Sequence, residues 1–298
     1  MNTRPITPDD FPALAAFLAE DETHLFGRPS RLGVADVTAW LTGPDLPNDS
    51  WLFEDGGGVV AVGWVEKHHD TGIAVGVVHR ERRGRGLGSE LVDRSEERLR
   101  ALGLGRVHAL SLAPDVAAEP LLTGRGYREV RRFWEMTIEL GVEPPPEPRL
   151  AAGFRIEPFS PELARPFHDA LEEAFEDHWE YQPTPFEQWW EEQTARPDHD
   201  PSLWFLVRSG DEVAAATRND LERSGGGWIG ALGVRRAWRG RGLAKALLLQ
   251  SFREFHRRGQ RRAGLGVDSE NATGATKLYE SVGMVVDSEQ VVWEKLLA

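Results

Sequence analysis

Apolar residues in the first half of the chain recur in a way that predicts a defined succession of strands and helices. A short apolar segment at 4–6 is followed by a stretch from Phe11 whose apolar positions return at the spacing of one helix face. Two apolar runs on either side of 56–58 predict a β-hairpin. A further apolar run ends at Val78, before a turn rich in glycine and arginine and a second helical pattern that extends to Leu99.

The second half repeats this succession from residue 154 onward. Its hairpin turns around Gly210, and its next apolar strand, 228–234, again runs into a turn rich in glycine and arginine. A helical pattern from Leu243 to Phe255 follows, as it does in the first half. A repeat about half as long as the chain indicates two tandem domains rather than the short stacked units of a solenoid.

Residues 141–153, GVEPPPEPRLAAG, separate the two repeats. Three consecutive prolines exclude a helix there and favour a stiff, extended connection. We therefore predict a first domain at 1–140, a linker at 141–153 and a second domain at 154–298. The length of 298 residues agrees, because a chain longer than about 200 residues usually divides into domains.

The composition excludes several classes of function. The chain has 48 acidic and 35 basic side chains, a net charge of -13, which argues against nucleic acid as the main partner. It has no cysteine, which excludes disulfides, thiolate metal ligands and cysteine nucleophiles, and no His/Asp cluster at metal-ligand spacing was found. No apolar run approaches the ~20 residues that span a bilayer, and the N-terminus lacks the features of a signal peptide. We therefore expect a cytoplasmic monomer or homodimer without a metal or a membrane partner.

Each turn rich in glycine and arginine has the residue types that hold an oxyanion. Gly240 and Gly242 lack a Cβ atom, so the backbone can curl and bring several N–H groups together. The helix that starts near Leu243 directs the positive end of its dipole to the same place, and Arg239 and Arg241 add positive charge.

The two turns resemble the acyl-CoA pyrophosphate loop of the GNAT superfamily of N-acetyltransferases. In that loop Gln or Arg is followed by two residues, Gly, one residue, and Gly or Ala, a pattern that RGRGLA at 239–244 and RGRGLG at 83–88 both match. The resemblance implies acetyl-CoA as the cofactor and two α/β (α+β) domains, each a twisted, mostly antiparallel sheet with helices on both faces. The residues that it implies for cofactor binding are Val77, Val78, Arg83, Gly84, Arg85, Gly86, Leu87 and Gly88 in the first domain, and Leu232, Gly233, Val234, Arg239, Gly240, Arg241, Gly242, Leu243, Ala244 and Asn271 in the second.

A second part of the family pattern occurs in the second half alone. There a predicted strand ends at Asn271, and the following helix carries Tyr279 before Gly283. The resemblance implies that Tyr279 protonates the departing thiolate of coenzyme A and that Asn271 orients the pantetheine arm or a water. Pro114 and Leu122 stand at the corresponding positions of the first half. We therefore expect catalysis in the second domain and a catalytically silent first domain.

The resemblance also implies that the segment after the first strand of the second domain forms the wall of the acceptor site. Here this segment is acidic and aromatic, and carboxylates with aromatic faces can hold an ammonium group. We therefore expect a small cationic metabolite or antibiotic as the acceptor, with a protein N-terminus or lysine as the other possibility. The residues predicted to bind it are Glu176, Asp177, Trp179, Tyr181 and Asp220. The general base stays open, because the strand at 228–234 carries no acid.

The sequence can be compared with four other interpretations. Mycothiol synthase is a tandem enzyme of the superfamily with a similar architecture, but the resemblance would require substrate-binding acids at 228–234, so we expect a different acceptor. A non-catalytic acyl-CoA sensor or regulatory protein is the alternative from another class. A Rossmann dinucleotide site and a P-loop do not fit, because neither turn has the glycine spacing of the first or the Gly-Lys-Ser/Thr of the second.

Overall fold

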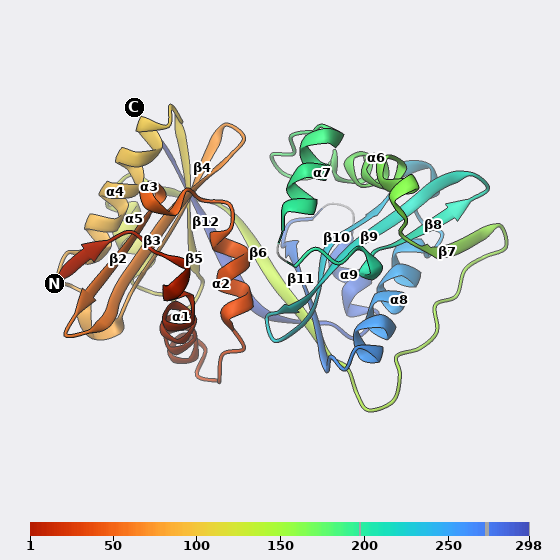
Figure 1. The fold of residues 1–298 in the computed structure, drawn as a ribbon, viewed down its shortest axis with the longest axis horizontal. Coiled ribbons are helices and arrows are strands. Elements are labelled where there is room, and N and C mark those ends of the chain that lie inside the picture. The colour runs from red at the N-terminus through yellow and green to blue at the C-terminus, as the bar shows by residue number, and fades with distance from the viewer. Residues whose placement is uncertain (197, 272–273, 298) are drawn as a thin grey trace. The chain divides into compact units, whose positions relative to one another are not determined.

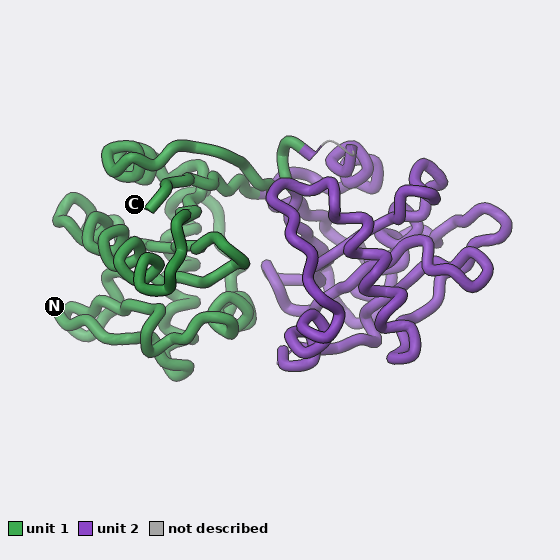
Figure 2. The backbone as a smooth tube through the Cα atoms, turned by 90° about the horizontal axis from the view of Figure 1, so that it is seen from above, with its two compact units in different colours: residues 1–134, 268–270, 288–298 green, residues 135–267, 271–287 purple. Residues whose placement is uncertain are grey.

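Consecutive antiparallel strands build the first part of the sheet in each half of the chain (Figure 1). The computed structural model describes residues 1–196, 198–271 and 274–297. They form two units, each with its own core, and each unit is described by itself (Figure 2). The mixed α/β fold with an open, mostly antiparallel sheet and helices confirms the predicted fold class.

Unit 1 contains most of the first half. Its elements are β1 (Asn2–Arg4), α1 (Phe11–Phe26), α2 (Val34–Leu41), α3 (Leu46–Asp49), β2 (Ser50–Asp55), β3 (Gly58–His68), β4 (Thr71–Val78), α4 (Leu87–Ala101), β5 (Arg106–Leu112), α5 (Ala118–Thr123) and the first part of β6 (Arg128–Glu139). Strands β1 to β4 pair antiparallel in chain order, and β4 then pairs parallel with β5. Short 3-10 turns precede α1 at Pro8–Asp10 and α4 at Arg80–Arg82.

Unit 2 has a similar succession of elements, with two α-helices before its second strand where unit 1 has three. They are β7 (Phe154–Pro158), α6 (Ala164–Phe175), α7 (Phe186–Ala195), β8 (Phe205–Ser209), β9 (Glu212–Arg223), β10 (Gly226–Val234), α8 (Leu243–Arg257), β11 (Arg262–Asp268) and α9 (Ala275–Glu280), with 3-10 turns at Pro161–Leu163, Pro201–Leu203 and Arg236–Trp238. Strands β7 to β10 pair antiparallel in chain order, and β10 pairs parallel with β11.

Helices cover both faces of the sheet in unit 2. A Cβ atom added at Gly227 of β10 would meet the Phe255 ring of α8, whereas one added at Gly233 would meet Ala174 of α6. Helices α6 and α8 therefore lie on opposite faces of β10 (Figure 1). The core on the α8 face includes the fully buried Leu243 and Leu247.

The two units do not coincide with the two halves of the sequence. The last strand, β12 (Val285–Leu296), pairs antiparallel with β5, from Gln290 opposite Leu112 to Leu296 opposite Arg106, and the segment from Ser288 onward belongs to unit 1. Conversely, β6 enters unit 2 at Glu135. The boundaries at 140 and 154 remain a prediction for the sequence repeats. Residues 141–153 form neither helix nor strand.

Two predicted positions differ from those in the structure. The first strand is Asn2–Arg4 rather than 4–6, because Ile6 leaves the strand to enter the core, where its N–H donates to Ser50 Oγ at 2.9 Å. Strand β11 ends at Asp268 rather than at Asn271, because the Asp268 carboxylate accepts the N–H of Glu270 at 2.9 Å where the chain turns. Helix α6 ends at Phe175, before Glu176 and Asp177.

Candidate functional site

Strands β10 and β11 pair over a short distance and then separate. The paired residues are Gly227 with Ala263, Trp228 with Gly264, and Ile229 with Leu265. From Gly230 to Val234, β10 keeps its ladder with β9 but pairs with no residue in the described part of β11. The peptide groups of the predicted cofactor residues Leu232, Gly233 and Val234 that face this side are thus open to a ligand, except Val234 O, which accepts a hydrogen bond from Arg239 Nε. A register shift between Ile229 and Ala231 accompanies the separation.

The turn after β10 ends in a glycine that starts α8. Gly240 has a φ of +75° and Gly242 a φ of +76°, a left-handed conformation that side chains rarely adopt. A Cβ atom added at either position would meet nothing within 4 Å, so the backbone is open to an approaching group. The first intrahelical bond runs from Ala246 N to Gly242 O, which leaves the N–H groups of Leu243 and Ala244 for a ligand. The turn is therefore an open cradle of N–H groups at the positive end of a 15-residue helix.

The arginines of this turn have different surroundings. Arg239 connects the turn to the end of β10 and to α6 and the residues after it. Its Nε donates to Val234 O at 3.2 Å, its Nη2 to Ala174 O at 3.2 Å and its Nη1 to Asp177 at 3.0 Å. The exposed Arg241 has its guanidinium 5.9 Å from the ring of Phe154 and, among the residues that the structure describes, no ion pair. Arg241, rather than Arg239, is the side chain available to an anion.

Unit 1 has the same turn after β4. Gly84 and Gly86 have φ values of +73° and +89°, and a Cβ atom at either would meet nothing within 4 Å. Arg83 Nε donates to Val78 O at 3.1 Å, as Arg239 does to Val234 O. Arg83 also binds Asp115 and Asp21, at 2.8 and 3.1 Å.

The remaining predicted residues of the first turn also have equivalents in the second. Arg85 is exposed and, within the described ranges, has no ion pair, like Arg241. Leu87 is buried as Leu243 is, and Gly88 lies one residue further along α4. Both glycine turns thus have the same open backbone geometry, and their role in holding a cofactor stays a prediction.

The two units differ in how far the strands separate. Strand β4 pairs with β5 as far as Val75 opposite Leu110, so only Gly76, Val77 and Val78 extend beyond the pairing. Strand β4 also pairs with β3 without a register shift. The opening beside β4 is therefore shorter than the one beside β10.

Tyr279 lies in α9, with its side chain buried. Burial raises the pKa of the Tyr279 phenol to about 12. No hydrogen bond to its hydroxyl is found among the described residues, so the group is neutral and uncommitted. In unit 1 the buried Leu122 of α5 holds the corresponding place. Asn271 follows β11 and is half-buried.

The acids predicted to bind an acceptor have partners in unit 2. Glu176 binds Arg236 at 2.9 Å, and Asp177 binds Arg236 at 2.7 Å and Arg239 at 3.0 Å. These two acids therefore stabilise the glycine turn, and the arginines hold the pKa of Asp177 below its usual value.

The aromatic residues of the predicted wall are half-buried. Tyr181 donates its O–H to Glu172 Oε2 at 2.7 Å, and burial together with this carboxylate raises the pKa of the phenol. Trp179 is half-buried. Trp189 and Trp190 of α7 pack on one another, and Trp189 also packs on Phe167 and Trp204, so both tryptophans belong to an aromatic cluster.

Asp220 is buried in β9 within a group of arginines that the sequence analysis missed. Its carboxylate lies 2.9 Å from Arg196, 3.4 Å from Arg218 and 4.0 Å from Arg223. The spacing of Arg218 and Asp220 along a strand could have placed them on one face. Nothing in the sequence brings Arg196, at the end of α7, to the same carboxylate.

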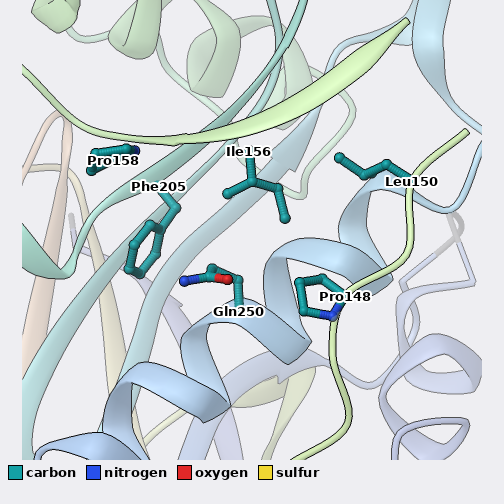
Figure 3. Close-up of a pocket in the computed structure, with 6 residues that line it drawn as sticks. All are labelled: Pro148, Leu150, Ile156, Pro158, Phe205 and Gln250. Carbon is teal, nitrogen blue, oxygen red and sulfur yellow. The ribbon is translucent and has the colours of Figure 1, made fainter. Parts of the chain in front are cut away.

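A hollow elsewhere in unit 2 has no reactive group. It is lined by Pro148, Leu150, Ile156, Pro158, Phe205 and Gln250 (Figure 3). Gln250 is the single polar side chain of this lining, so the hollow offers neither charge nor a nucleophile. Among the described helices none is both long and apolar enough to cross a membrane.

Comparison with known proteins finds the same family in both halves. The sequence matches the acetyltransferase (GNAT) family over residues 14–127 and again over 164–284. A mycothiol acetyltransferase of Thermobispora bispora is 34% identical over 227 residues, 74% of each chain. The mycothiol acetyltransferase of Streptomyces coelicolor is 28% identical over 97% of this chain and 92% of its own.

Solved structures give a consistent result. A GCN5-related N-acetyltransferase from Sphaerobacter thermophilus is 33% identical, with a TM-score of 0.86 over 99% of this chain and 95% of its own. A tandem GNAT protein from the clavulanic acid biosynthesis pathway is 18% identical, with a TM-score of 0.73 over 100% and 98%. The latter likeness concerns the fold alone.

Proposed function

Because this chain belongs to the GNAT acetyltransferase family, with one match in each half, we propose that it transfers an acetyl group from acetyl-CoA to a small-molecule amine in its second half. The observation that carries this proposal is the separation of β10 from β11 after Ile229, directly before the open glycine turn at the start of α8. A thin, extended thioester can lie between separated strands while its diphosphate reaches the N–H cradle.

The residues of unit 2 fit this cofactor. The N–H groups of Gly242, Leu243 and Ala244 would hold a pyrophosphate, with Arg241 as the nearest available cation. The peptide groups from Leu232 to Val234 that face away from β9, apart from Val234 O, would hold the pantetheine arm, together with Asn271, three residues after the end of β11. Acetyl-CoA supplies an activated acetyl thioester when it is bound.

The residues of the site must then assist the transfer of the acetyl group from sulfur to nitrogen. An amide bond forms between the amine nitrogen and the acetyl carbon, the carbon–sulfur bond breaks, and the proton lost by the amine balances the proton gained by the sulfur. Tyr279 keeps its hydroxyl proton at neutral pH and can donate a hydrogen bond to the departing sulfur; because burial raises its pKa to about 12, the proton transfer requires the phenol to be positioned beside that sulfur. We assign Tyr279 as the catalytic residue on this basis.

We propose that the first half does not catalyse the reaction. It has the apolar Leu122 in place of the tyrosine, and its strands separate over a shorter length. Its glycine turn is as open as that of the second half, so it is expected to retain acetyl-CoA binding.

The acceptor is proposed to be a small amine that is cationic in solution and deprotonated before attack. The acceptor of the mycothiol acetyltransferases is the second candidate, because relatives with that name align with most of this chain. Against it stands the absence of any acid from Trp228 to Val234 of β10.

The proposal is tested by incubating the protein with acetyl-CoA and a panel of amines that includes the precursor of mycothiol. Thiol release and the mass of the acetylated product are the measurements, and Tyr279→Phe is the comparison variant. We expect amine-dependent thiol release that the variant loses. Binding of acetyl-CoA without turnover of any amine would instead support a non-catalytic acyl-CoA sensor.

A further inference from the structure

The group of arginines around Asp220 has more positive than negative charge. Arg196 binds both Asp198 and Asp220, at 2.8 and 2.9 Å, while Arg218 and Arg223 approach Asp220 alone. Three guanidinium groups thus face two carboxylates. This excess is notable in a chain whose net charge is -13, because a purely structural ion-pair group has no need of it.

Much of the hydrogen-bonding capacity in this group is unused. A guanidinium has five N–H donors, but Arg218 reaches Asp220 through Nη1 alone, at 3.4 and 3.5 Å. Its Nε and Nη2 have no acceptor among the residues that the structure describes, and its side chain is 15% exposed. Nε of Arg223 is buried without a partner. Leaving such donors unpaired is costly, so the group is suited to receiving an anion.

The arginines lie where β10 leaves β11. A Cβ atom added at Gly230, the first residue beyond the paired region, would come within 2.7 Å of Arg218 Nη2 and 3.1 Å of Asp220 Oδ2. Trp228, two residues earlier, has the Arg223 guanidinium 5.2 Å from its ring. The free donors of Arg218 therefore adjoin the strand opening to which we assign the thioester.

Desolvation lowers the pKa of Arg218, and the charges of Arg196 and Arg223 act in the same direction. An anion bound at these donors would offset both effects. Asp220, by contrast, already faces three guanidinium groups. A substrate ammonium would have to compete with all of them for its carboxylate.

We propose that the acetyl acceptor carries an anionic group, a carboxylate or a phosphate, which Arg218 and Arg223 bind while the amine faces the opening beside Gly230. This inference rests on the proposed function and narrows its substrate class. The acceptor is then a zwitterion in solution, whose amine is the cation expected from the sequence.

The test compares amines in pairs that differ in the anionic group alone. One arm uses amino acids and their carboxamides, and the other uses amino sugar phosphates and the parent amino sugars. Wild-type protein should acetylate the anionic member of at least one arm with a kcat/KM about tenfold or more above its partner, as expected for a charge-assisted bidentate contact. The arm that shows the preference identifies carboxylate or phosphate.

Two variants assign the preference to these arginines. Arg218→Gln and Arg223→Gln should each raise KM for the amine that carries the anionic group about tenfold, leave KM for its partner without that group unchanged and bring the pair toward equality. Both leave Arg196 on Asp220, at 2.9 Å, so the carboxylate keeps a partner. Arg257→Gln removes an exposed arginine of α8 and is the matched control, with no expected change.

A binding measurement separates failure of this inference from failure of the proposed function. With coenzyme A saturating the glycine turns, inorganic phosphate should raise the unfolding temperature of wild type and Arg257→Gln more than that of Arg218→Gln. If coenzyme A binds but the phosphate effect is equal in all three proteins, and the amine pairs show no preference, the inference is wrong and the proposed function stands. If coenzyme A does not bind, both are wrong.

Discussion

Leu122 in α5 and Tyr279 in α9 occupy the same place in their respective turns. Leu122 O accepts the N–H of Tyr127 at 3.0 Å, and Tyr279 O accepts the N–H of Met284 at 3.1 Å, so each carbonyl closes its helix onto the residue five positions later. Both side chains are buried. The two repeats thus place one phenol and one isobutyl group at matched backbone positions.

The phenol gives the first prediction. Tyr279→Phe removes one oxygen from a buried side chain and should lower kcat by about 10²-fold or more, the usual contribution of a positioned proton donor. Affinity for acetyl-CoA, measured by calorimetry, should change little. Tyr127→Phe, which removes a buried phenol from unit 1, is the control and should keep full activity. Equal loss in both variants would contradict the assignment.

The glycine turns give the second prediction. Gly242→Glu and Gly86→Glu each place a carboxylate and a strained left-handed residue at the start of a helix that would hold a phosphate. Calorimetric titration of acetyl-CoA should show two sites in wild type and the loss of one in each variant. Gly210→Glu has a comparable φ of +60° in an open hairpin turn and should retain both sites. If Gly242→Glu still binds acetyl-CoA at two sites, the second glycine turn does not hold the cofactor.

The third prediction concerns Arg241, which is the exposed arginine of the second turn without an ion pair among the described residues. Arg241→Gln should weaken acetyl-CoA binding to the second half about tenfold, since it removes a charge-assisted contact to phosphate. Arg236→Gln lies in the same turn but its guanidinium binds Glu176 and Asp177, so the affinity should change much less. A larger loss of acetyl-CoA affinity in Arg236→Gln than in Arg241→Gln, in the same titration, would contradict the choice of Arg241.

The fourth prediction concerns pH. Burial raises the pKa of each of the chain's three tyrosines, Tyr127, Tyr181 and Tyr279, the last to about 12. The native protein should therefore show little tyrosinate absorbance at pH 10, where an unperturbed tyrosine is about half ionised. Absorbance that rises fully with a midpoint near 10 while the protein is folded would contradict these environments.

The raised pKa of Tyr279 also makes the stability of the protein depend on pH. The folded protein retains the Tyr279 proton at pH values above the pKa of a tyrosine in the unfolded chain. The stability that comes from burying the neutral phenol is therefore fully present below pH 10 and is lost as the pH rises to 12. The free energy of unfolding should fall over that window by up to about 3 kcal/mol from this group. Tyr279→Phe should show a smaller fall, measured by denaturant titration at each pH.

The fifth prediction concerns packing beneath β10. A methyl group at Gly227 would lie 2.3 Å from the Phe255 ring, so Gly227→Ala should destabilise the protein by about 1–3 kcal/mol or prevent folding. Gly266→Ala, in the neighbouring strand, would place its methyl 4.0 Å from Trp228 and should cost much less. Denaturant midpoints of the two variants measure the difference.

Local patterns were sufficient to predict the cradles. The glycines at 240 and 242 and the apolar residues from Leu243 onward fix the turn and the helix start through backbone conformation and periodicity, and both lie where expected. The equivalence of Leu122 and Tyr279 also followed from spacing within a short segment.

Features that depend on tertiary contacts were not predictable in this way. The sequence predicts that Asp220 binds the acceptor, but no local pattern shows that Arg196, 24 positions earlier in the chain, reaches its carboxylate. Likewise, Asp177 binds Arg239 across a separation that no local pattern encodes. The sequence also could not identify β12 as the strand that pairs with β5, because any apolar strand with a suitable alternation of residues can pair with a sheet edge.

The pairing of β5 with β12 sets the order in which the protein can fold during synthesis. Leu110 of β5 is opposite Val292, 182 positions later, so unit 1 lacks a strand until β12 has left the ribosome. During translation of the second half, β5 therefore presents an unpaired edge that is open to other strands. A chain that stops before β12 would leave this defect in the first unit, far in sequence from the missing strand.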